Sequence, residues 1–178
     1  MTFKTAALTA CVFLCAHATR AQDMKKPVSA GLGFELGPTA GVTKTDFSGM
    51  FGPTTWLAFR AGHGFLSLTT GFLLFVPVST SADKSDASFQ IPVLAGYKYI
   101  FMHERLFVKG ELGASHFTHT FHDSREAEPV PSWTSWGPTL ALSAGYQFNP
   151  MELSLKDEIF PSSGLGIHYY AFQLGFDF

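Results

Sequence analysis

Three histidines close together in the sequence are the first candidates for chemistry. His116, His119 and His122 follow one another at intervals of three residues, and imidazole is a common zinc ligand. On an extended strand, side chains three residues apart point to opposite faces. His116 and His122 share a face but would lie about 20 Å apart at the rise of a strand. Only a loop could gather them, with Asp123 as a further ligand, so we expect solvated histidines and no metal site.

A hydroxyl, an imidazole and carboxylates occur in the same segment, as His122-Asp123-Ser124 with Glu126. These are the residue types of a serine hydrolase, in which a base activates the hydroxyl and an acid orients the base. Catalysis needs such groups held in one geometry, whereas here they crowd into one polar segment without a glycine pair for an oxyanion hole. The sequence therefore predicts no catalytic residue and no cofactor.

The N-terminal residues have the features of a secretory signal peptide. Lys4 provides a positive start, residues 6–16 are almost wholly apolar, and Ala18-Thr19-Arg20-Ala21 has small residues where a signal peptidase reads them. We predict cleavage after Ala21. The alternative is a lipoprotein signal at Leu8-Thr9-Ala10-Cys11, which leaves only about six apolar residues before the cysteine, fewer than the usual 7–15.

Cysteine usage and charge exclude several classes of function. Cys11 and Cys15 both lie in the predicted leader, so the mature chain has no disulfide, cysteine-ligated metal or thiol nucleophile. Of the 12 basic residues, Lys4 and Arg20 also lie there, which leaves 10 against 14 acidic residues, a net charge of −4. No basic surface for nucleic acid is expected.

The composition is too apolar for an ordinary soluble domain. Charged residues make up 15% of the chain, against about 25% in typical soluble proteins, and 19 residues are Phe. Beyond the leader there is no run of 18 or more apolar residues, the mark of a membrane helix. Apolar surface without long apolar runs indicates alternation along strands.

Apolar and polar residues do alternate with the period of a β-strand. The last segment is clearest, because Tyr170, Phe172 and Leu174 lie on one face with Phe176 and Phe178. Eight such segments predict eight strands, at 33–42, 57–61, 66–74, 89–99, 108–113, 139–148, 151–156 and 169–178.

The predicted connections alternate in length. The long ones are Thr43–Pro53, Ser79–Ser88 and Thr118–Ser135, and the short ones are 62–64, 102–105 and 149–150, with 161–165 of moderate length. Outer-membrane barrels have short periplasmic turns and longer external loops. The pattern places the N- and C-termini on the periplasmic side.

We therefore predict an all-β protein, an eight-stranded antiparallel up-and-down transmembrane β-barrel at residues 31–178. Residues 1–21 are the signal peptide and 22–30 a short periplasmic segment. A soluble calycin-like barrel is the rival, but its surface would be dense in Lys and Glu, whereas the polar face here is mainly small residues, as in a narrow filled lumen. An aromatic girdle is expected at the periplasmic interface, from Tyr97, Tyr99, Tyr146, Phe148, Phe176 and Phe178.

Charged side chains on the polar face should form a network in the lumen. The nine residues are Glu35, Arg60, Lys98, Lys109, Glu111, Glu152, Lys156, Glu158 and Asp177. Lys109 and Glu111 are neighbours on one face, as are Glu152 and Lys156. A charge inside a lumen must be paired or hydrated. Five acids and four bases nearly balance, which favours an electrostatic plug; the alternative is a path for protons or ions.

Several segments resemble a known family. Ser88–Tyr99 is similar to the central strand of the small outer-membrane β-barrels called the porin family or PorT-like barrels, and Leu106–Phe117, with its glycines, is similar as well. The terminal Leu174-Gly175-Phe176-Asp177-Phe178 resembles the signal read by the barrel-assembly machinery, with Leu174, Phe176 and Phe178 as its apolar residues. One departure is Gln173, where such signals commonly have glycine.

The resemblance implies an architecture and an outer-membrane location, and it does not imply an activity. Members of the family include structural barrels, adhesins and accessory subunits of secretion or uptake complexes. We expect a non-enzymatic structural or accessory component that contacts outer-membrane lipid and lipopolysaccharide, meets the assembly machinery during biogenesis and binds a protein partner. The alternatives are a small-solute pore and a lipid A-modifying enzyme, since His122-Asp123-Ser124 is similar to the His-x-Ser arrangement of lipid A deacylases.

The longest predicted loop, Thr118–Ser135, is the candidate recognition surface. Hairpin loops need only about 2–5 residues, so this one exceeds what joining two strands requires. Tryptophan and arginine are enriched in binding hot spots, although tryptophan also marks the membrane interface. The candidate contact residues are Phe121, Asp123, Arg125, Glu126, Glu128 and Trp133.

Overall fold

The computed structural model describes residues 27–78, 87–101, 105–120, 133–161 and 166–178. The predicted signal peptide, residues 1–21, lies outside these ranges. The first strand begins at Val28, three residues before the predicted start of the barrel at Gly31.

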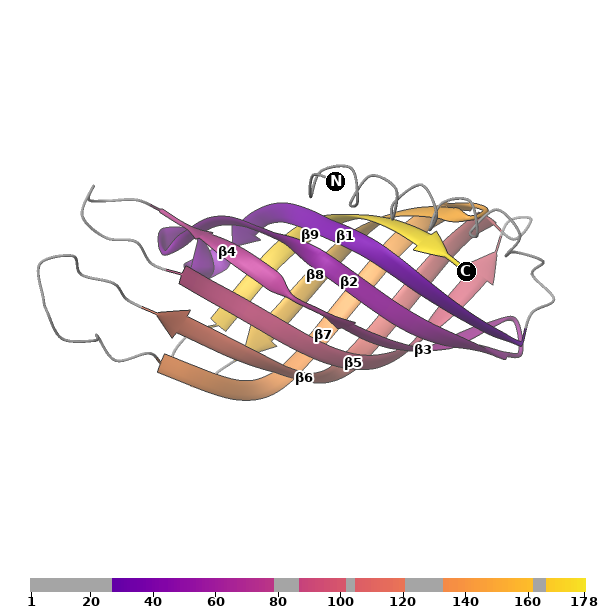
Figure 1. The fold of residues 1–178 in the computed structure, drawn as a ribbon, viewed down its shortest axis with the longest axis horizontal. Helices are drawn as coiled ribbons and strands as arrows, with labels where there is room; N and C mark the ends of the chain where they lie inside the picture. Colours follow the sequence, from indigo (N-terminus) through magenta and orange to yellow (C-terminus); the bar gives the residue numbers. More distant parts are fainter. Residues whose placement is uncertain (1–26, 79–86, 102–104, 121–132, 162–165) are drawn as a thin grey trace, which may run out of the picture.

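Nearly all of the described chain is extended (Figure 1). The strands are β1 (Val28–Ala40), β2 (Phe47–Ala61), β3 (Gly64–Gly71), β4 (Leu73–Pro77), β5 (Ala87–Phe101), β6 (Leu106–Thr120), β7 (Trp133–Phe148), β8 (Met151–Pro161) and β9 (Gly166–Asp177). A short 3-10 helix, η1 (Gly41–Thr45), joins β1 to β2. No helix in the described part of the chain is long and apolar enough to cross a membrane.

The strands close into a single barrel with eight positions around its ring. β3 and β4 are separated by Phe72 alone, and both pair with β2 and with β5, so together they fill one position. Every other strand pairs with its neighbours in the sequence, and β9 pairs with β1 to complete the ring. All these pairings are antiparallel. The predicted eight-stranded up-and-down barrel is confirmed.

Alternation along the strands sorts side chains into an inner and an outer face. In β8, buried residues occupy every second position from Glu152 to Phe160. In β9, Tyr170 and Phe172 are exposed while Gln173 and Asp177 are buried, as predicted. Burial here means enclosure by the barrel, so the buried face of each strand lines the lumen and the exposed, apolar face forms the outer wall.

The predicted loop Thr43–Pro53 is wrong over most of its length. Residues 41–45 form η1, which also removes Val42 from the predicted first strand, and β2 begins at Phe47. The pairing of β2 with β4 shifts register between Phe47 and Gly49. Such a bulge inserts an extra residue and reverses which face the following residues occupy. The interrupted alternation concealed the strand.

The other long connections are shorter than the sequence suggested. β6 continues to Thr120, β7 begins at Trp133 and β5 includes Ser88, so both ends of the predicted loop Thr118–Ser135 are strand. Residues 79–86, 121–132 and 162–165 lie outside the described chain. The short turns predicted at 62–64 and 149–150 agree with the structure, while residues 102–104 of the third lie outside the described chain. Gly62, between β2 and β3, has a positive φ of 62° that glycine adopts readily.

Candidate functional site: the barrel interior

The interior of the barrel is lined by buried side chains from every strand and contains two layers. One layer is a network of lysines, carboxylates and neutral polar groups, and the other is a cluster of aromatic and aliphatic side chains. The pairing register decides which residues of neighbouring strands meet in each layer.

Lys156 is at the centre of the charged layer. Its ammonium Nζ lies 3.2 Å from Glu35 Oε1 on β1 and 2.7 Å from Glu158 Oε2 on β8, and all three side chains are buried. Gln90 on β5 donates a 2.8 Å hydrogen bond to the other oxygen of Glu158. The lysine thereby links β8 to β1, and Glu158 links β8 to β5 through Gln90. A fully buried charge is tolerated only with such compensation.

Two further ion pairs lie in the same layer. Lys109 Nζ is 3.1 Å from Glu111 Oε2, and Thr69 donates a 2.5 Å hydrogen bond to the other oxygen of Glu111. Lys98 forms an ion pair with Glu152 and also lies 4.2 Å from the centre of the Phe107 ring. The Lys109–Glu111 pair was predicted from their spacing on one strand.

The structure corrects two parts of the predicted network. Glu152 and Lys156 share a face but do not pair with each other, because Glu152 pairs with Lys98 on β5 and Lys156 pairs with Glu35 on β1 and with Glu158 on its own strand. Arg60 has the inward parity yet is exposed, since it lies at the end of β2 beside the turn into β3, where the lumen opens. The buried residues that the structure describes therefore contain five carboxylates and three lysines.

Neutral side chains connect the charged groups. Ser115 accepts hydrogen bonds from Gln90 (2.9 Å) and Thr139 (2.7 Å). Gln173 accepts a bond from Ser154 (3.1 Å) and donates one to Thr54 (3.2 Å). Gln173, where the assembly signal commonly has glycine, thus has a position in the interior network.

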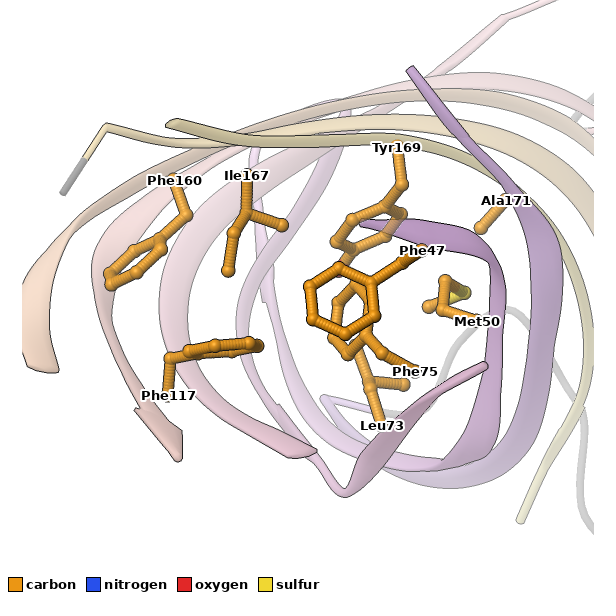
Figure 2. Close-up of a cluster of buried hydrophobic side chains, with 9 residues drawn as sticks. All are labelled: Phe47, Met50, Leu73, Phe75, Phe117, Phe160, Ile167, Tyr169 and Ala171. Carbon is orange, nitrogen blue, oxygen red and sulfur yellow. The ribbon is translucent and has the colours of Figure 1, made fainter. Parts of the chain in front are cut away.

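The second layer is an aromatic plug that the sequence did not predict (Figure 2). It lies toward the end of the barrel where β4 leads into β5 and β6 into β7, and it consists of Phe47, Met50, Leu73, Phe75, Phe117, Phe160, Ile167, Tyr169 and Ala171. Phe75 contacts Phe47, Phe117 and Tyr169 edge-on, with ring centres 5.5–5.9 Å apart.

The aromatic plug was missed because the inner face was assumed to be polar. Phe117 has the same parity as Lys109 and Glu111, and Phe160 has the same parity as Lys156. Extending the inner parity of each strand to its far end would have identified these residues. Inward position, rather than polarity, is what the period of two determines.

The histidine cluster is divided between the two faces, as predicted. His116 points outward and its ring lies 4.8 Å from that of Trp136, whereas His119 contacts the buried Phe47, with ring centres 5.7 Å apart, and hydrogen-bonds with Ser88. His122 lies outside the described residues. No group of three or more His, Cys, Asp or Glu residues within the described ranges could hold a metal ion.

The outer wall is apolar along the full length of the strands. Leu112, Leu140 and Leu155 are 66%, 58% and 67% exposed. Asp157 is the single carboxylate on an outward-facing strand position of the described residues, and it contacts His168 at 2.7 Å. Of the predicted girdle, Tyr97, Tyr99 and Phe148 are exposed on this wall.

The candidate recognition loop falls largely outside the structure. Phe121, Asp123, Arg125, Glu126 and Glu128 are not among the described residues. Trp133 is the first residue of β7, so its assignment to a loop was wrong. Trp136, three residues further along β7, is 69% exposed on the outer wall.

Comparison with solved structures identifies the class of fold. The chain is similar to Ail, the attachment invasion locus protein of Yersinia pestis (TM-score 0.58, 16% identity, covering 85% of this chain and 97% of Ail). It is also similar to Neisserial surface protein A (0.56, 9%, 85% and 96%) and to the N-terminal β-barrel domain of Pseudomonas aeruginosa OprF (0.54, 12%, 86% and 98%). No protein-family model and no curated protein matches the chain. The fold is that of the small eight-stranded outer-membrane β-barrels.

Proposed function

We propose that the chain is an integral outer-membrane β-barrel without enzymatic activity, a structural or accessory component that acts through its external loops or its outer wall. In this proposal residues 1–21 direct export, and both ends of the barrel domain lie in the periplasm. The PorT-like resemblance is part of the proposal, as are contacts with lipopolysaccharide, with the barrel-assembly machinery and with a protein partner.

The outer wall supports a membrane location. Burying apolar surface is worth about 25 cal/mol per Å², so a ring of exposed Leu and Phe side chains is unfavourable in water. Barrels in the outer membrane present such an apolar band to lipid. Tyr97 and Tyr99 lie near the end that carries the barrel termini, which is where an interfacial aromatic girdle belongs.

The filled lumen is the observation that carries the assignment to a structural rather than a transport role. The ion network occupies the middle of the barrel, and the aromatic plug occupies the end near the long connections. An eight-stranded barrel encloses little more than its own side chains. A small-solute pore would need a continuous water-filled path through the lumen. Two layers of buried side chains lie across that path, which argues against a pore.

Planar-bilayer recording tests this proposal. The full chain should locate to the outer-membrane fraction of a Gram-negative host, and the purified protein should show no large steady conductance. The double variant Phe117→Ala/Phe160→Ala removes two rings of the aromatic plug and should give more frequent current fluctuations. Phe72→Ala, which removes a ring from the outer wall, is the matched control and should not. A large steady conductance of the native protein would favour the pore.

A further inference from the structure

The contact between β1 and β9 is the seam at which the barrel closes. These strands come from opposite ends of the barrel sequence and form eight residue pairs, as many as β2 and β3 and fewer than the fifteen between β5 and β6. The β1–β9 ladder is also interrupted at Gly37 and Pro38, since proline has no N–H to donate. Because the ladder is interrupted, side-chain contacts inside the barrel can add to the stability of the closed ring.

One residue pair crosses this seam inside the barrel. Trp56 on β2 is paired with Gly31 on β1, and Gly31 is paired with Asp177 on β9, so the three lie in one cross-strand row. The Trp56 indole extends across Gly31 and donates a 2.7 Å hydrogen bond from Nε1 to Asp177 Oδ1. Trp56 and Asp177 are 6% and 4% exposed. The side chain of Trp56, on β2, therefore binds β9 directly.

Glycines on both sides of the seam make room for the indole. A Cβ atom at Gly31 would lie 2.1 Å from indole Cε2, and one at Gly175 would lie 2.4 Å from Cη2. At Gly33 the distance to Cζ3 would be 3.0 Å. Contacts under 3 Å would force the rigid ring out of place. The three glycines thus form a cradle fitted to Trp56.

Further side-chain bonds cross the same seam. Gln173 on β9 donates to Thr54 on β2 (3.2 Å), and Lys156 on β8 donates to Glu35 on β1 (3.2 Å). At the other end of the seam, Thr43 of η1 donates to the carbonyl of Gly166 (2.8 Å). Closure is thus supported from the interior as well as by the backbone ladder.

We propose that Trp56 acts as a closure latch, which stabilises the closed ring relative to an open sheet. In a sheet whose β1–β9 ladder has not formed, all the other ladders can be complete, but Trp56 cannot reach Asp177 and the glycine cradle is not assembled. Losing the latch therefore shifts the balance between closed and open forms. The inference depends on the barrel geometry and is independent of the cellular role proposed above.

Refolding into detergent micelles tests the latch. The full chain carrying Cys11→Ser and Cys15→Ser is diluted from urea into micelles and run on a gel without heating. The closed fraction is the share of protein in the band whose position changes after boiling. Trp56→Phe keeps an aromatic ring but removes the N–H, and should lower the ratio of closed to unclosed protein by roughly fivefold or more, as expected for a buried acceptor left without its donor. Ser115→Ala removes interior hydrogen bonds away from the seam and is the control for general loss of stability.

A pair of engineered disulfides separates closure from stability. Leu36→Cys/Phe172→Cys joins β1 to β9 at paired outward positions, and Val93→Cys/Ala114→Cys joins β5 to β6 in the same way. The seam disulfide should restore the closed fraction of Trp56→Phe, and the β5–β6 disulfide should not. Equal rescue by both, or an unchanged closed fraction in Trp56→Phe, would overturn the proposal.

Fluorescence gives an independent measurement on the unmodified latch. Trp133→Phe/Trp136→Phe leaves Trp56 as the single tryptophan of the chain. Its emission should shift to shorter wavelength at the same rate as the closed band appears, because the indole is buried only in the closed ring. A shift that clearly precedes closure would contradict the latch.

Discussion

At the scale of single residues, the barrel interior depends on how a few buried charges are compensated. Lys156 is enclosed between Glu35 and Glu158, and Glu158 also accepts a hydrogen bond from Gln90. Removing one partner of a buried pair is far more costly than replacing the whole pair, since the remaining charge stays buried and uncompensated. The same reasoning applies to Lys109 and Glu111.

Replacing Lys156 by methionine should therefore destabilise the barrel strongly. The side chain keeps a similar length, but Glu35 and Glu158 lose their shared ammonium, and we expect the free energy of unfolding to fall by about 3–5 kcal/mol. Denaturant unfolding in micelles measures the change. Lys44→Met, at an exposed position of η1, is the control and should change stability by no more than about 0.5 kcal/mol. An unchanged unfolding midpoint for Lys156→Met would indicate a hydrated lumen.

At the scale of elements, the two faces of the last strand, β9, have different roles. Its outward residues Leu174, Phe176 and Phe178 form the proposed assembly signal, and its inward residues Gln173 and Asp177 bind other strands inside the barrel. The backbone N–H of Phe178 also donates a 2.7 Å hydrogen bond to Ala30 of β1. The strand that would be recognised during assembly is thus also the strand that closes the ring.

Changing Phe178 to aspartate should lower the amount of protein in the outer membrane and leave unfolded chain in the periplasm. The charge would remove the terminal aromatic of the signal and place a carboxylate at the proposed interface. Immunoblotting of fractionated cells measures both pools. Val28→Asp puts the same charge on the outer face at the start of β1 and serves as the control. Equal levels in both variants would argue against a C-terminal signal.

The connection between β6 and β7 contains most of the candidate contact residues, and its residues 121–132 lie outside the described chain. The two strands remain paired as far as His119 and Trp133, so replacing residues 123–131 by a tight turn should leave the barrel folded. If this segment is the recognition surface, a native pull-down from mildly solubilised membranes should lose a partner, while heat-modifiable migration is retained. Retention of every partner would exclude the segment from recognition.

At the scale of the whole molecule, the protein has an inside-out distribution of polarity. Eight charged side chains of the described strands are buried in the lumen, and most of the outward-facing strand positions in the described ranges are apolar. In water the outer wall would drive association, whereas in lipid or detergent it is solvated. The distribution accounts for the low overall content of charged residues, because the outer surface does not need them.

The purified chain should accordingly be soluble only with detergent and give a β-rich circular dichroism spectrum there. It should also migrate differently on a gel before and after boiling, because a closed barrel with buried ion pairs resists detergent until heated. A helical spectrum, or a monodisperse protein without detergent, would contradict the proposed environment.

The architecture, and the face on which most residues lie, could be predicted from alternation along the chain. A period of two is a local property, so alternation from Phe89 to Tyr99 or from Tyr169 to Phe178 is readable without any knowledge of neighbours. The predicted turns at 62–64 and 149–150 depend on equally local signals. The assignment failed at Phe47–Gly49, where a bulge breaks the local period.

Which inward residues meet could not be predicted in the same way, because it depends on contacts between strands. Pairing register and ring closure place Glu152 beside Lys98 rather than Lys156, and they leave Arg60 at the open end of the barrel. They also gather residues from distant strands into the aromatic plug and bring Trp56 across Gly31 to Asp177. Parity along one strand assigns a face, but position along and across the lumen depends on how all the strands are aligned with one another.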